Sequence, residues 1–72
     1  MTPAELDAAL LVAHAAGDRA ALSGLYTHAA ECAPDETAAG FYLTHAYIFA
    51  LEAGLPEAEG LRQRLKAQGR ED

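Results

Sequence analysis

The sequence predicts a small all-α domain of four antiparallel helices, arranged as two stacked helical hairpins. Alanine and leucine dominate the composition, with 18 Ala and 10 Leu among 72 residues. These residues favour helices, whereas the β-branched residues that favour strands are scarce. Three short breaks, at residues 17–18, 34–35 and 54–56, divide the chain into four nearly equal pieces. Connections this short fold consecutive helices back along each other, and a plain four-helix bundle is the alternative arrangement.

The first hairpin is predicted over residues 1–34. Its first helix is expected over residues 3–16, because Thr2 and Glu5 have the capping-box spacing and a proline stands at the first helical position. Gly17 ends this helix, since glycine readily adopts the left-handed conformation found after a helix C-terminus. Apolar residues at helical spacing are expected to face the core, namely Leu6, Ala9, Leu10 and Ala13.

The second helix is predicted over residues 19–33, with Asp18 as its N-cap and Pro34 as its stop. Gly24 inside this helix and Gly40 inside the next predict that the two helices cross closely on their glycines. Replacement of either glycine by leucine is then expected to lower the melting temperature sharply. The expected core stripe of the second helix is Leu22, Leu25, Ala29 and Cys32.

The second hairpin is predicted over residues 35–72, and its first helix, over residues 36–53, is the most apolar of the four. Asp35 is the expected N-cap. A helix that is apolar on two sides either lies buried between neighbours or buries one side in a partner. One stripe, expected in the core, is Leu43, Ala46, Tyr47 and Ala50. The second stripe is Phe41, His45, Ile48, Phe49 and Glu52.

The last helix is predicted over residues 56–68, with Pro56 at its first position. Its core stripe is narrow and consists of Ala58, Leu61 and Leu65, while the opposite face is charged. Basic residues gather near its C-terminal end, where the helix dipole favours them. A basic docking strip for an acidic partner is the other interpretation of Arg62, Arg64, Lys66 and Arg70.

The charge and hydropathy exclude several classes of function. The net charge is −6, and residues 1–59 alone carry nine acids and one base, a balance of −8. Such a surface disfavours nucleic acid and anionic membranes as partners. No stretch reaches the roughly 18 apolar residues of a membrane span. Without a basic N-terminal region typical of a signal peptide, and with a single thiol, the chain is expected to be cytoplasmic.

The short length predicts that the domain depends on a partner. A chain of this size buries only about 60% of its unfolded surface, so its core is marginal. Its one cysteine, Cys32, cannot form an internal disulfide or a cysteine-based zinc site. Binding to another protein, or to a second copy as a homodimer, is therefore expected.

The pattern resembles the tetratricopeptide repeat, in which a helix–turn–helix unit carries a glycine, an aromatic residue, an alanine and a proline at fixed spacing. Gly17, Tyr26, Ala29 and Pro34 have that spacing. The second half follows the pattern more loosely, through Leu43, Ala46, Tyr47, Ala50, Gly54 and Ala58. Large Leu10 and Tyr47 replace the small residue of the family, Ala13 and Ala50 replace an aromatic residue, and the two turn glycines are 37 residues apart rather than 34.

The resemblance implies a scaffold for protein–protein contact, an adaptor or accessory subunit of a larger complex, with no catalysis of its own. In such repeats the first helix of each pair lines a concave groove, which here means residues 3–16 and 36–53. The groove candidates on these two helices, together with the aromatic second stripe of residues 36–53, give a predicted partner-binding set of eight residues. They are Leu11, His14, Phe41, Tyr42, His45, Ile48, Phe49 and Glu52.

The sequence shows no pattern that would make the chain an enzyme or hold a cofactor. The alternative function is a metal- or ligand-binding helical bundle that uses His14, His28 and His45, with Glu31 or Glu52 completing a metal site. No pair of these histidines has the spacing that places two ligands on one helical face. His28 and Cys32 share a face, but no oxyanion hole or third orienting group is evident, so Cys32 is expected to be a small core residue.

Overall fold

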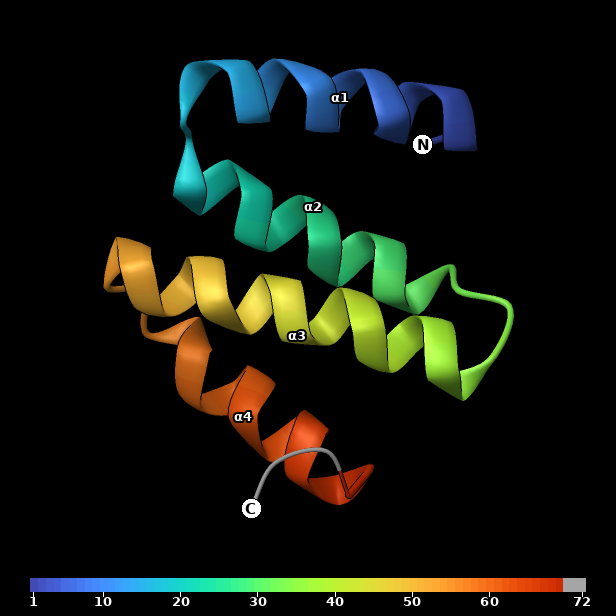
Figure 1. The fold of residues 1–72 in the computed structure, drawn as a ribbon, viewed down its shortest axis with the longest axis vertical. Coiled ribbons are helices and arrows are strands. Elements are labelled where there is room, and N and C mark those ends of the chain that lie inside the picture. Colours follow the sequence, from blue (N-terminus) through green and yellow to red (C-terminus); the bar gives the residue numbers. More distant parts are fainter. Residues whose placement is uncertain (70–72) are drawn as a thin grey trace.

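The computed structural model describes residues 1–69, which form four α-helices and no strand. Consecutive helices run antiparallel to each other (Figure 1). The predicted all-α fold of four helices is thereby confirmed. Residues 70–72, which the second hairpin was predicted to include, lie outside the described residues. The helices are α1 (Pro3–Ala16), α2 (Arg19–Glu31), α3 (Glu36–Ala53) and α4 (Glu57–Ala67).

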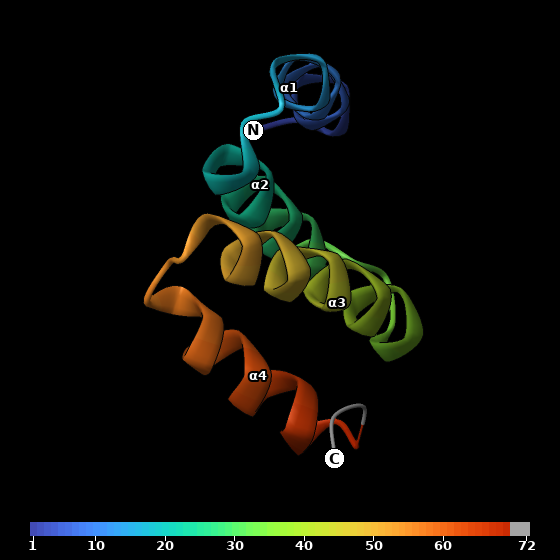
Figure 2. The ribbon, with the colours of Figure 1, turned by 60° about the vertical axis from the view of Figure 1, so that its left-hand side comes forward.

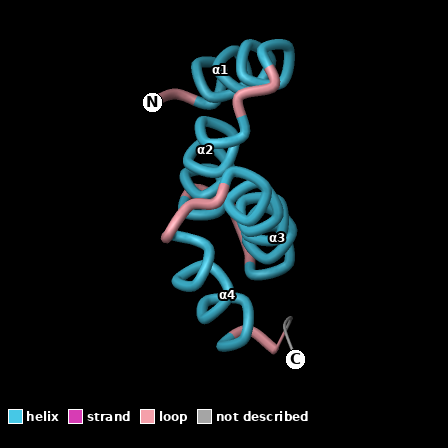
Figure 3. The backbone as a smooth tube through the Cα atoms, turned by 90° about the vertical axis from the view of Figure 1, so that its left-hand side faces the viewer, coloured by secondary structure: helices cyan, strands magenta, loops and turns pink. Residues whose placement is uncertain are grey.

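The four helices form a row in which close backbone contacts join each helix to its neighbours in the sequence. Over the described residues, α1 contacts α2, α2 contacts α3, and α3 contacts α4, with the most extensive contact between α2 and α3. Figures 2 and 3 show the same succession from two further sides. The molecule measures 32 × 29 × 14 Å, so the row is little more than one helix thick. The backbones of the two end helices, α1 and α4, therefore each pack against a single neighbour.

Local side-chain chemistry fixes where α1 begins. The Thr2 amide donates to Glu5 Oε1 at 2.7 Å, and the Glu5 amide donates to Thr2 Oγ1 at 3.1 Å, which completes the predicted capping box. The bond from the Thr2 amide favours the ionised carboxylate and holds the pKa of Glu5 below its ordinary value.

The remaining predicted caps are also confirmed. Asp18 accepts a hydrogen bond from the Ala21 amide at 3.1 Å at the start of α2, and Asp35 caps α3 in the same way. Gly17 and Gly54 follow α1 and α3 with φ of +65° and +67°, a conformation that favours glycine over any residue with a Cβ.

Three predicted helix ends were wrong by one or two residues. The second helix ends at Glu31 rather than at residue 33, because Pro34 disfavours the helical conformation at the residue before it and Cys32 already leaves the helical region. The last helix begins at Glu57, one residue after the predicted start, and ends at Ala67. Pro56 takes the N-cap position, where its side chain makes no capping hydrogen bond.

The core lies along α3 and consists mostly of small residues. Leu43, Ala46 and Ala50 are almost completely buried, and Leu61 and Leu65 cover them from α4 as predicted. Ser23 of α2 is buried as well, and its Oγ donates to the Ala46 carbonyl at 2.9 Å. Alanine on α3 and serine on α2 let the two helices approach closely. Of the predicted core stripe on α1, Ala13 is buried, and Leu6, Ala9 and Leu10 are half-buried. The stripe is only partly covered because the backbone of α1 packs against α2 alone.

Two predictions about α2 were wrong. Cys32 is exposed rather than in the core, because the helix ends before it and no neighbouring helix covers it. Gly24 is exposed too, and a Cβ added there would meet nothing within 4 Å, so no close crossing depends on this glycine. It faces a groove between α2 and α4 instead, where it lies with Gly60 and Leu61.

The open surroundings of Gly24 predict a stabilising substitution. Gly24→Ala should raise the free energy of unfolding by about 0.5–1 kcal/mol, because alanine has the higher helix propensity and no contact is disturbed. For a domain of this size that gain corresponds to a rise of roughly 2–8 °C in melting temperature. Gly54→Ala is the matched control and should lower the melting temperature, since φ is positive there. A Gly24→Ala variant that melts below the wild type would contradict the open surroundings of Gly24 in the structure.

Candidate functional site

Six aromatic and histidine rings from three helices gather on one face of the row, around Tyr26 of α2. This set, called the aromatic cluster below, connects elements that are distant in the sequence. Its members are His14 of α1, Tyr26 of α2, and Phe41, Tyr42, His45 and Phe49 of α3.

Tyr26 lies at the centre of the aromatic cluster. Its ring is stacked on Phe49, with centroids 5.8 Å apart and planes within 10°, and its centroid lies 5.1 Å from that of His45. Tyr42 and His14 contact the same ring at centroid distances of 6.2 and 5.9 Å. These separations are typical of attractive ring pairs, each of which contributes about 0.5–1.5 kcal/mol beyond area burial. The cluster is thus a preformed surface.

Hydrogen bonds hold both histidines of the cluster in place. His14 Nε2 lies 3.0 Å from Tyr26 Oη, which joins α1 to α2. His45 Nδ1 lies 2.9 Å from the Phe41 carbonyl oxygen. Because a carbonyl only accepts, Nδ1 must donate the proton, and the Nε2 atom of the neutral His45 ring is then the available acceptor. The two imidazoles therefore present defined orientations to anything that covers the surface.

The edge of the surface carries one ion pair. Arg19 Nε donates to Glu52 Oε1 at 2.8 Å and so ties the start of α2 to the end of α3. Both side chains are about half exposed, so the pair contributes at most ~1 kcal/mol. The predicted site residue Glu52 is consequently already engaged within the chain.

The structure brings together five of the eight residues predicted for partner binding: His14, Phe41, Tyr42, His45 and Phe49. Ile48 is exposed two turns after Phe41 on α3, and Leu11 is exposed one turn before His14 on α1. Phe41 itself is 58% exposed, so this edge of the aromatic cluster presents apolar surface to the solvent.

Tyr26 is the site residue that the predicted set omits. It follows Gly17 at the spacing where the tetratricopeptide repeat has an aromatic residue, and that spacing was the available indication. Which rings it meets depends on the crossing of α2 and α3, and helical periodicity does not define that crossing.

The three histidines do not converge. His14 and His45 both contact Tyr26, whereas His28 Nε2 lies 3.7 Å from Cys32 Sγ at the C-terminal end of α2. Among residues 1–69, no three side chains of His, Cys, Asp or Glu are placed to share a metal ion. The geometry thus offers no site for the alternative of a histidine-based metal-binding bundle.

Within the same described residues, no helix combines the length and the hydropathy that crossing a bilayer requires. Comparison with protein-family models, with curated protein sequences and with solved structures finds no match to this chain. The aromatic cluster is therefore the feature from which a function can be inferred.

Proposed function

We propose that this chain is a small protein–protein interaction module, an adaptor or accessory subunit of a larger complex, without catalysis of its own. The aromatic cluster is the contact surface, and Leu11 and Ile48 extend it at either side. The observation that carries the proposal is the exposure of Phe41 and Ile48 beside a cluster of ordered rings. Aromatic residues, phenylalanine and tyrosine among them, are enriched in the buried core of protein interfaces.

The open row of helices supports the same proposal. In stacked helical repeats each helix contacts its neighbours, and one face of the stack remains free for a partner. The chain shows this succession of contacts, and the rings of α1, α2 and α3 lie on a common face. The tetratricopeptide-like arrangement and a cytoplasmic location are parts of this proposal, as is self-association of the free protein.

Phe41→Ala is expected to abolish most partner binding, by tenfold or more, while the fold persists, because the exposed ring adds little to the core. A protein that co-purifies with the wild type from the native host should be lost from the variant. Sedimentation of the purified chain under reducing conditions measures self-association in parallel.

Leu51→Ala is the matched control for this experiment. Leu51 lies on the same helix and is 54% exposed, but it lies beside Tyr47, Leu55 and Pro56, toward α4. This variant should keep the partner and the wild-type sedimentation. Equal binding by Phe41→Ala and the wild type, with both folded, would exclude the aromatic cluster as the contact surface.

A further inference from the structure

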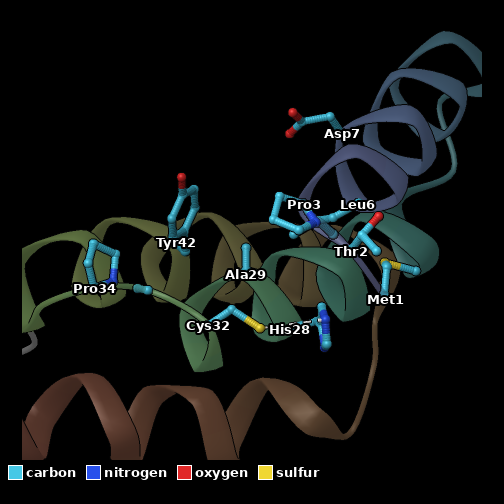
Figure 4. Close-up of a pocket in the computed structure, with 11 residues that line it drawn as sticks. Met1, Thr2, Pro3, Leu6, Asp7, His28, Ala29, Cys32, Pro34 and Tyr42 are labelled. Atoms are coloured by element: carbon cyan, nitrogen blue, oxygen red, sulfur yellow. Dashed lines mark hydrogen bonds between the residues drawn. The ribbon is translucent and has the colours of Figure 1, made fainter.

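Beside the aromatic cluster, a pocket of about 220 Å³ opens between the N-terminal half of α1 and the C-terminal end of α2. Pockets for drug-sized ligands occupy about 300–1,000 Å³, so this one has the size for a single side chain. Figure 4 shows its lining residues. Asp7 and Tyr42 lie on one side of the place where α1 meets α2, and His28 and Cys32 lie on the other.

Most residues that line the pocket are apolar, Thr2, His28 and Cys32 add polar groups, and Asp7 adds a carboxylate. Pro3 and Leu6 of α1 face Ala29 and Ala33 near the end of α2 across it. Asp7 is the lining residue with a carboxylate, and within the described residues it forms no hydrogen bond or ion pair. An unpaired acid above apolar walls matches a side chain with a methylene stem and a cationic head, that is, lysine or arginine.

Tyr42 adds an aromatic face to the same pocket and links it to the aromatic cluster. Its ring lines the pocket and stacks on Tyr26, with centroids 6.2 Å apart. A cation over an aromatic face gains about 0.5–1 kcal/mol at an exposed site. The C-terminal end of α2, which is the negative end of its dipole, lines the pocket, and the capping carboxylate of Glu5 offsets the positive end of α1.

We propose that this pocket receives a lysine or arginine side chain from a basic segment of a partner protein, with Asp7 as the counter-ion and Tyr42 as the aromatic wall. The inference rests on the proposed function and specifies the chemistry of the partner. The balance of −8 over residues 1–59 would attract such a segment and speed its association. Residues that flank the cation in the partner would then lie along the aromatic cluster.

The test uses a Gly/Ser peptide with three spaced arginines and a second peptide in which neutral, isosteric citrulline replaces each arginine. Titration of the isotope-labelled full chain is followed by NMR, because amide shifts locate the contact. The arginine peptide should shift the amides of Asp7, Ala29, Ala33 and Tyr42. Asp7→Asn should weaken its binding about fivefold, a loss of ~1 kcal/mol.

Glu57→Gln is the control for Asp7→Asn, since it removes the same charge from α4, which does not line the pocket. It should change the affinity less than twofold. Tyr42→Phe should keep the binding, whereas Tyr42→Leu should weaken it, and circular dichroism verifies that each variant is folded. The proposal is overturned by equal binding of the citrulline peptide, by equal losses in Asp7→Asn and Glu57→Gln, or by the absence of shifts at millimolar peptide.

The failure of this inference is distinguishable from failure of the proposed function. Loss of the native partner by Phe41→Ala but not by Asp7→Asn would support the aromatic cluster as the contact surface and exclude the proposed role of the pocket. Retention of the partner by both variants would exclude the proposed contact surface as well as the proposed role of the pocket.

Discussion

Replacement of Leu43 by alanine is expected to lower the free energy of unfolding by about 2–5 kcal/mol, because it leaves a cavity at the centre of the core. Leu43 is 1% exposed and is the largest fully buried side chain among the described residues. A domain of 72 residues has a total stability of roughly 4–11 kcal/mol, so the variant should be partly unfolded at moderate temperature.

Thermal and urea unfolding followed by circular dichroism measure this loss, and a fall of roughly 10–30 °C in melting temperature is expected. Leu51→Ala, on the same helix but exposed, should stay within about 0.5 kcal/mol of the wild type. Equal melting temperatures for the two variants would show that α3 is not the centre of the core.

Replacement of Ala46 by leucine should destabilise the chain in the opposite way, by overfilling the contact between α2 and α3. Ala46 is completely buried, and its carbonyl accepts the hydrogen bond from Ser23 Oγ. Added methylene groups must separate the two helices, at a cost of about 1–3 kcal/mol. The same separation should pull Tyr26 away from Phe49, so the near-ultraviolet circular dichroism of the tyrosines should weaken as well.

Ala53→Leu controls for the added volume, because Ala53 lies on α3 but is exposed. It should preserve both the urea midpoint and the tyrosine spectrum. An Ala46→Leu variant with wild-type stability would mean that the two helices have room between them that the structure does not show.

Sequence reasoning succeeded where structure depends on local chemistry. Thr2 and Asp18 each bind an amide three residues later, so the beginnings of α1 and α2 follow from residues adjacent in the chain. Helical spacing likewise identified Leu43 and Ala50 as buried. Such features require no knowledge of how the helices are placed relative to each other.

Prediction from the sequence failed where the structure depends on how whole helices are placed relative to each other. Because α3 is apolar on two sides, its periodicity could not distinguish the face toward α2 from the face that carries Phe41. The stripe on α2 included Cys32 because spacing continues past the point where the helix ends. Gly24 was expected at a close helix crossing because a glycine stands inside each of the two helices, whereas the neighbouring helix leaves Gly24 uncovered. The central position of Tyr26 depends on the same crossing of α2 and α3.

The exposed thiol of Cys32 has a practical consequence for every measurement of assembly. It is the single cysteine of the chain and lines the pocket that we assign to a cationic side chain. Slower reaction of this thiol with a maleimide would report occupancy of that pocket without an engineered residue. In air, the same sulfur could join two molecules covalently, and such a cross-linked species would be mistaken for a natural dimer unless a reductant is present.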